Sequence, residues 1–150
     1  MSDAKAREIQ RWSSGVHPDA ELCYENESAV LYFHPRVRIV HHQLRGFIRG
    51  EQFRTLLEEG LKLLQSRRAS KWLSDDRLNA PVTPADERWI KTDWTPRALA
   101  AGWKYWAIVL PENVLGQMNM RRWIEAHGQL GVTAQSFSEP EAARRWLEER

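Results

Sequence analysis

Short apolar runs alternate with longer helical patterns along most of the chain, and this alternation restricts the fold more than any other feature of the sequence. Two β-rich runs, AVLYF and VRIVHHQL, flank a short turn centred on Pro35 and predict a hairpin. Strands are also expected over 71–74, 104–110 and 132–137, and helices over 50–66, 83–101, 113–127 and from 138 onward. Strands that alternate with helices imply right-handed crossovers between parallel strands. The predicted fold class is therefore α/β, with a mixed, mainly parallel sheet opened by a β-hairpin and with about four helices.

The helix predicted over 50–66 has the clearest pattern, because its apolar side chains recur at spacings of three and four. These positions are Phe53, Leu56, Leu57, Gly60, Leu61 and Leu64. Charged and polar side chains occupy the other side, so we expect this helix to pack against the sheet.

A second helix is predicted to begin after Thr83. Thr83 is a good N-cap, Pro84 suits the first helical position, and Asp86 places negative charge in the first turn, where the helix dipole favours it. Pro96 lacks a backbone N–H, so we expect a kink or a break there. Gly102 is the predicted C-terminal stop.

The last two helices carry more specific predictions. The candidates for burial on the helix over 113–127 are Val114, Leu115, Met118, Trp123 and Ile124. Ser138 and Glu141 form a Ser-x-x-Glu capping box, which predicts that the terminal helix opens at Ser138.

The composition favours a single domain that has no internal disulfide bonds. Among 150 residues, 42% are hydrophobic, so we expect a single domain over 20–150 preceded by a polar arm over 1–19. Cys23 is the sole cysteine and cannot form an internal disulfide. The net charge of +2 is a small excess and does not indicate a nucleic-acid partner. No leader-like or membrane-spanning apolar run occurs, so we expect a cytoplasmic protein with no membrane span.

Five segments carry a resemblance to a known family: LRGFIRGEQFRTLLEEGLKLL, KWLSDDR, TPADERWIKTDWTPRALAAG, AIVLPENVLGQMNMRRW and SFSEPEAARRWL. In their order and spacing they resemble the STAS domains, the sulfate-transporter and anti-sigma-factor-antagonist family. The similarity is to the stand-alone bacterial proteins described as STAS-like or CRAL-TRIO-like, and it covers residues 29–149. That branch has no assigned activity, so the resemblance implies a fold and a binding role.

One part of the family pattern is missing. Regulatory STAS domains share a turn after the central strand, and a partner kinase phosphorylates a serine in that turn. The matching stretch here reads SDDRL from Ser74, without a Ser-Gly pair, and Ser74 is expected to belong to the strand. We therefore expect no phosphorylation switch at Ser74.

Three histidines, His34, His41 and His42, lie close together in the sequence. Neighbouring strand residues face opposite sides of a sheet, so His41 and His42 cannot share a site. With the turn at Pro35, His34 and His41 are expected roughly 13 Å apart, too far for two ligands of one ion. The sequence therefore predicts no metal site.

Signatures of nucleophilic catalysis are also missing. The sequence has no Gly-x-Ser-x-Gly elbow and no glycine-rich phosphate loop after a strand, so we expect a protein that is not an enzyme and holds no cofactor. Asp75, Asp76 and Asp86 could serve as paired acids, but acids in such places often cap backbone donors.

The candidate site is predicted from position. In open parallel sheets, ligands bind where the chain leaves the carboxyl ends of the strands, here at 75–83 and 111–114. The helix after the first exit mixes indoles, acids and a guanidinium on one stripe. The predicted ligand- or partner-binding residues are Asp75, Asp76, Arg77, Asn79, Asp86, Trp89, Asp93, Trp94, Arg97 and Glu112. The alternative is that Asp93 and Arg97 pair at the surface while the Trp rings fill the core.

Three functions follow from these patterns. The first is a non-enzymatic STAS-like binding or regulatory module that contacts a protein partner or a second copy of itself as a homodimer. The second is a carrier of a small apolar or lipid-like ligand in a Trp-lined cleft, since the chain has eight tryptophans. The third is a hydrolase or isomerase that uses Asp75 and Asp86.

Overall fold

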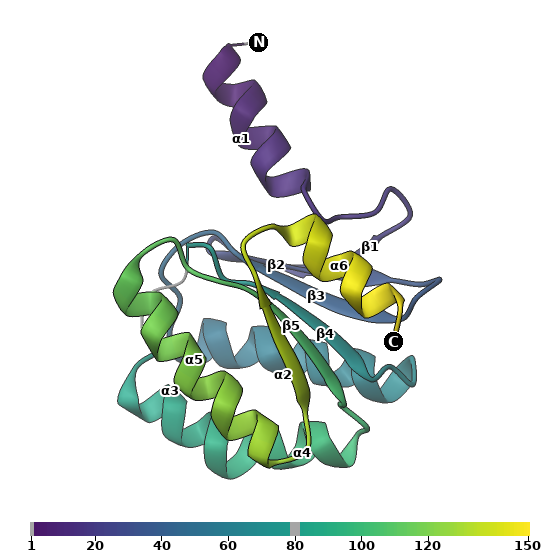
Figure 1. Cartoon of the computed structure of the whole chain (residues 1–150), viewed down its shortest axis with the longest axis vertical. Coiled ribbons are helices and arrows are strands. Elements are labelled where there is room, and N and C mark those ends of the chain that lie inside the picture. Colours follow the sequence, from purple (N-terminus) through teal and green to yellow (C-terminus); the bar gives the residue numbers. More distant parts are fainter. Residues whose placement is uncertain (1, 79–81) are drawn as a thin grey trace.

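The computed structural model describes residues 2–78 and 82–150, which form a six-stranded sheet with helices on both faces (Figure 1). The strands are β1 (Glu21–Glu25), β2 (Ala29–His34), β3 (Ile39–Leu44), β4 (Lys71–Asp75), β5 (Tyr105–Val109) and β6 (Thr133–Phe137). The helices are α1 (Asp3–Ser13), α2 (Gly50–Ser66), α3 (Pro84–Trp89), α4 (Thr95–Ala100), α5 (Val114–Gln129) and α6 (Pro140–Glu148), with a π-helical turn η1 (Ile90–Trp94) between α3 and α4.

The sheet has the mixed topology that the sequence predicts. Its strands follow chain order, with antiparallel pairing from β1 to β3 and parallel pairing from β3 to β6. The α/β fold class is therefore confirmed. Strand β1 is an addition to the prediction. It is an edge strand whose side chains are mostly exposed, so it lacks the apolar run that marks the others.

The helices divide between the two faces of the sheet. Helices α2 to α5 cover one face, and α6 lies on the other beside the start of the chain (Figure 1). Every parallel crossover moves to the next strand in the same direction, so a common right hand places all the crossover helices together. The larger core lies on this shared face, and a smaller core lies under α6, where Ala143 and Leu147 contact Leu73 and its neighbours.

The helical segment over 84–100 continues through Pro96 without a break. Thr83 caps it through its hydroxyl, and Pro84 lies at its start, as the sequence predicts. Pro96 cannot donate to the carbonyl four residues earlier, and the chain accommodates this with the wider π-helical turn η1 just before it. The expected kink is thus a local change of helix type.

Helix α5 does not bury all the side chains that the sequence assigns to its inner face. Val114, Leu115 and Met118 are 73%, 63% and 57% exposed, so their predicted burial is wrong. The inner stripe runs instead through Met120 and His127, which places those three side chains on the outward side.

The predicted capping box at Ser138 is also wrong. The N-cap of α6 is Glu139, which makes no side-chain capping bond, and Pro140 takes the first helical position. A proline disfavours helical backbone at the residue before it, so Glu139 stays extended. The helix therefore begins one residue later than the box requires.

Among the described residues, no helix is both long and apolar enough to cross a bilayer.

Candidate functional site

A cavity of about 90 Å³ lies between the sheet and the helices α2 to α5; we call it the Trp cavity. Its aromatic walls are Trp72, Trp94, Trp103, Trp106 and Trp123. The other lining residues are His42, Leu44, Phe53, Leu57, Ser74, Asp76, Val82, Ile90, Met120 and His127. Close-packed interiors leave few voids larger than a water molecule, which needs about 10–15 Å³. The cavity therefore has room for a small molecule.

Strand alternation and register produce the polar end of this cavity. On β4, Trp72 and Ser74 face the helices α2 to α5, and Asp76 continues the same face just beyond the strand. On β3, His42 is paired with Ser74 and points to the same side. The side chains of His42, Ser74 and Asp76 are thus brought together at one end of an otherwise apolar cavity.

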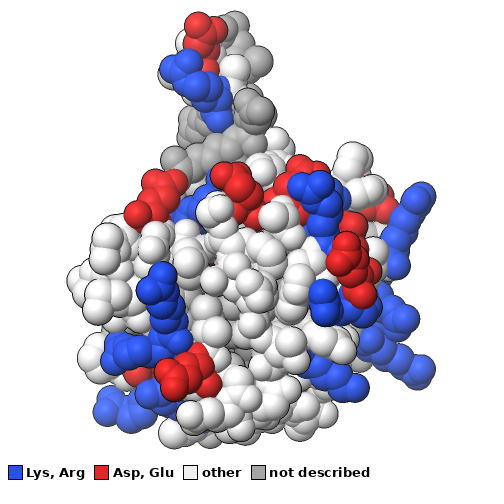
Figure 2. Space-filling model, viewed as in Figure 1, with Lys and Arg blue, Asp and Glu red and all other residues white. Residues whose placement is uncertain are grey.

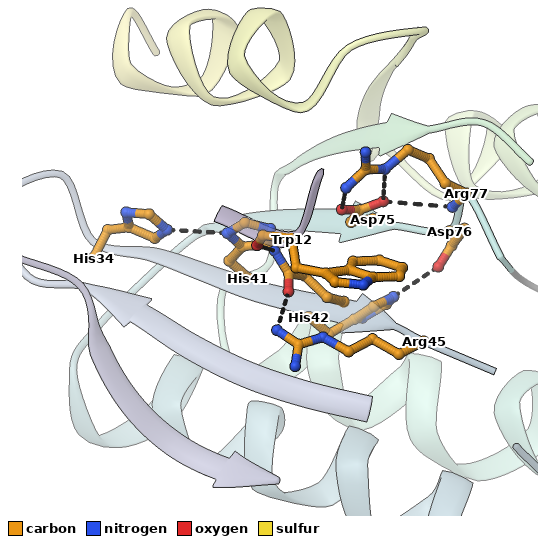
Figure 3. Close-up of polar contacts among 9 residues, drawn as sticks. Trp12, His34, His41, His42, Arg45, Asp75, Asp76 and Arg77 are labelled. Carbon is orange, nitrogen blue, oxygen red and sulfur yellow. Dashed lines mark hydrogen bonds and ion pairs between the residues drawn. The ribbon is translucent and has the colours of Figure 1, made fainter. Parts of the chain in front are cut away.

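A chain of hydrogen bonds joins Trp72, His42 and Asp76. The Trp72 indole N–H donates to Nδ1 of His42 over 3.0 Å. His42 Nε2 lies 2.8 Å from Oδ1 of Asp76 (Figure 3). An indole can only donate, so Nδ1 is the acceptor and the imidazole proton is on Nε2. His42 is therefore a neutral imidazole that donates to Asp76, and both of its nitrogens are occupied.

The indole walls are held by one another and by hydrogen bonds. Trp94 lies edge-to-face against Trp72 and Trp103, with ring centroids 5.3 and 5.6 Å apart. Its N–H donates to the Leu57 carbonyl over 2.9 Å, and the Trp106 N–H donates to Ser74 Oγ over 2.8 Å. Edge-to-face packing with bonded N–H groups fixes the ring positions. The cavity is thus preformed.

His127 lies at the α5 side of the cavity. Its Nδ1 lies 2.8 Å from the Trp123 carbonyl, which can only accept, so Nδ1 carries the proton. Burial lowers the pKa of His127, while the bond to Trp123 acts in the opposite direction. The ring packs against Trp103 and Trp106 and serves as a neutral part of the wall.

Of the ten predicted site residues, the structure places Asp76 and Trp94 in the cavity lining. Asp75 and Arg77 point to the opposite face of the sheet, where the guanidinium binds both carboxylate oxygens at 2.9 and 2.7 Å (Figure 3). The strand exit therefore divides between two faces and does not form a single polar patch.

The other predicted residues lie outside the cavity lining. Asp86 accepts hydrogen bonds from the Gly50 N–H and Arg54 Nε at 2.8 and 3.1 Å, so it ties α3 to the start of α2. Burial acts to raise the pKa of Asp86, but those bonds and one involving Thr83 outweigh it and lower the pKa. Trp89 lies under the Arg54 guanidinium.

Arg97 joins two helices at the surface. Its guanidinium binds the Glu58 carboxylate on α2 and, at 2.7 Å, the Asp93 carboxylate on η1. This is the arrangement in which Asp93 and Arg97 pair at the surface. Glu112 is exposed, and its backbone N–H donates to the Arg77 carbonyl over 3.4 Å. Asn79 lies outside the described residues.

The predicted separation of His34 and His41 is wrong. Nε2 of His34 lies 3.1 Å from Nδ1 of His41, because His34 pairs with Ile39 and His41 is its diagonal neighbour on the same face (Figure 3). His42 faces the opposite side, as expected. Within the described part of the chain, no group of three or more His, Cys, Asp or Glu side chains is placed to hold a metal ion.

Sequence reasoning missed most of the cavity lining, including His42, Ser74 and Met120. A usable signal was present on β3 and β4, where period-two alternation places His42, Ser74 and Asp76 on the same side as the large residues Trp72 and Leu44. Polar side chains on a face that should be buried indicate a site.

The comparisons with known proteins add no relative. Neither a scan against protein-family models nor searches of curated proteins and of solved structures gave a match to this chain. The resemblance to STAS-like proteins therefore stays a prediction, and the site is interpreted from its own geometry.

Proposed function

We propose that the protein binds a small, largely apolar molecule in the Trp cavity and does not convert it. The observation that carries this proposal is a preformed cavity of about 90 Å³ with five indole walls and a polar end at His42, Ser74 and Asp76. Ligand sites are commonly apolar concavities with a few placed polar groups. The predicted similarity to CRAL-TRIO-like proteins supports the same function.

The hydrogen bonding favours binding over catalysis. A catalytic histidine needs one nitrogen directed at the reacting group, whereas both nitrogens of His42 are engaged by Trp72 and Asp76. Ser74 has no base among its hydrogen-bond partners in the described residues, since its oxygen accepts from the Trp106 indole. A hydrolase or isomerase that uses Asp75 and Asp86 has no support from this arrangement, because Asp75 is paired with Arg77 on the other face of the sheet and Asp86 ties α2 to α3.

The test compares two substitutions on α5. Met120 lines the cavity, and Met118 is exposed on the same helix, so Met120→Trp fills the cavity while Met118→Trp is the matched control. Native mass spectrometry of the purified protein is expected to show a bound small molecule in Met118→Trp but not in Met120→Trp. Calorimetry with benzyl alcohol is expected to give the same contrast. The proposal is overturned if the unmodified protein retains no small molecule and binds neither benzyl alcohol nor a charged probe of the same size.

A second candidate function is contact with another copy of the chain, which one observation favours. The outward row Val114, Leu115 and Met118 on α5 is exposed, and the face drawn in Figure 2 is largely uncharged across its middle. A row on one helix can pair with itself across a two-fold axis. Sedimentation equilibrium is expected to show a dimer that Leu115→Glu dissociates, and a monomer at high concentration would exclude this function.

A further inference from the structure

The electrostatics of the Trp cavity restrict the ligand further. Among the described lining residues, Asp76 is the one side chain that carries a charge, since His42 and His127 are neutral. Asp76 is 4% exposed, and its Oδ1 accepts from His42. No Lys or Arg side chain is part of the described lining. A buried carboxylate without a cationic partner is unfavourable, so this end of the cavity attracts positive charge.

The protein's own histidine does not supply that charge. Protonation of His42 would place a hydrogen on Nδ1, where the Trp72 N–H already points at 3.0 Å. The two hydrogens would repel, so the contact with the indole fits an imidazole that has no hydrogen on Nδ1. The nearby guanidinium of Arg77 is held by Asp75 on the opposite face of the sheet. The positive charge that balances the Asp76 carboxylate is therefore expected to come from a bound ligand.

The walls suit the same kind of ligand. Indole rings attract cations through their π electrons and bind apolar groups by contact. We infer that the ligand is a small organic ammonium ion, with its charged end beside Asp76 and its apolar body among Trp94, Trp103 and Trp106. This inference rests on the proposed function, because it assumes that the Trp cavity is the binding site.

The experiment compares three probes of nearly equal size: benzylammonium, benzyl alcohol and benzoate, each titrated by calorimetry. Benzylammonium is expected to bind at least about tenfold more tightly than benzyl alcohol, and benzoate more weakly than both. Asp76→Asn keeps an oxygen for the His42 N–H but removes the charge, so it should abolish the preference for benzylammonium. Asp93→Asn is the control, since Asp93 lies on the surface and pairs with Arg97.

The outcomes separate the two proposals. If benzyl alcohol binds as tightly as benzylammonium, the charge inference is overturned and the small-ligand function stands. If none of the probes binds and no small molecule is retained, both are overturned. If Asp93→Asn reduces benzylammonium binding as much as Asp76→Asn does, the preference arises from surface charge and the inference fails. High salt also distinguishes a preference for benzylammonium that comes from surface charge from one that comes from Asp76. Salt weakens an exposed ion pair more than a buried one, so a preference due to Asp76 should persist.

Discussion

The indole of Trp72 on β4 and the imidazole of His42 on β3 are joined by a hydrogen bond of 3.0 Å between Nε1 and Nδ1. This contact determines which nitrogen of His42 carries the proton, and hence which nitrogen donates to Asp76 at 2.8 Å. The polar end of the Trp cavity therefore depends on an aromatic side chain that also forms its wall.

The first prediction concerns that donor. Trp72→Phe leaves a buried acceptor on His42 without a partner, whereas Trp106→Phe leaves Ser74, whose hydroxyl can rotate and donate. Both substitutions replace an indole by a phenyl ring, so the side-chain volume that is lost is the same. We expect Trp72→Phe to lower the free energy of unfolding by about 1–3 kcal/mol more than Trp106→Phe, measured by urea denaturation. Equal losses would mean that the bond to His42 has no special role.

Gly60 gives a second prediction, because a Cβ there would overlap the Trp72 ring. Gly60→Ala gains up to about 1 kcal/mol of helix propensity, but overpacking against the indole costs about 1–3 kcal/mol. We expect a net loss of stability in urea denaturation. Gly128→Ala on α5 is the control, since nothing lies within 4 Å of the added carbon, and it should be neutral or stabilising. If both variants become more stable, the contact with Trp72 is not tight.

Periodicity predicted the elements whose burial is simple. Helix α2 has the expected bounds and inner face, because each apolar position on its stripe contacts the core. The prediction fails on α5, where the buried stripe includes His127 and leaves Val114 outside. Hydrophobicity alone cannot give the phase of a helix that has apolar side chains on two sides.

The cavity needed information that is not local in the sequence. Its lining comes from β3, α2, β4, η1, β5 and α5, and the contact of Trp94 with Trp72 depends on how η1 and β4 pack together. The His34–His41 contact likewise depends on hairpin register. The turn includes Arg38 at a φ of 54°, and its length determines which histidines become diagonal neighbours.

The third prediction concerns pH. Burial, together with nearby positive charge, lowers the pKa of His34 to about 4 and that of His41 well below its ordinary value. The titratable and charged groups around the pair are Arg77, Arg144, His17, His42 and Asp19. The unfolded chain therefore binds more protons than the folded protein below about pH 6.5. The contribution of the neutral histidines to the free energy of unfolding is complete above that pH and is lost as the pH falls toward 4.

For His34 alone, the difference between 6.5 and about 4 corresponds to roughly 3 kcal/mol at full titration. We expect the free energy of unfolding, measured in urea, to decrease between about pH 7 and pH 5. His34→Asn removes one of the titrating groups and should reduce this decrease. A variant that keeps the full decrease would show that the buried pair does not cause it.

The last prediction concerns Trp12, which attaches the N-terminal helix to the sheet. Its ring lies between the guanidiniums of Arg45 and Arg77, each 5.3 Å from the ring centroid, and its carbonyl accepts from Gln43 at 2.7 Å (Figure 3). Beyond this contact, α1 extends away from the rest of the protein (Figure 1). Each of these two cation–π contacts contributes about 0.5–1 kcal/mol at an exposed site.

Trp12→Ala is expected to increase hydrogen exchange along α1 and to lower the free energy of unfolding by about 1–2 kcal/mol. Lys5→Ala, an exposed change on the same helix, is the control and should leave both quantities unchanged. Because Trp12 and the Trp cavity lie on opposite faces of the sheet, benzyl alcohol should bind to Trp12→Ala with an affinity within about twofold of the unmodified protein. A larger loss of affinity would mean that the N-terminal helix is coupled to the cavity through the strands between them.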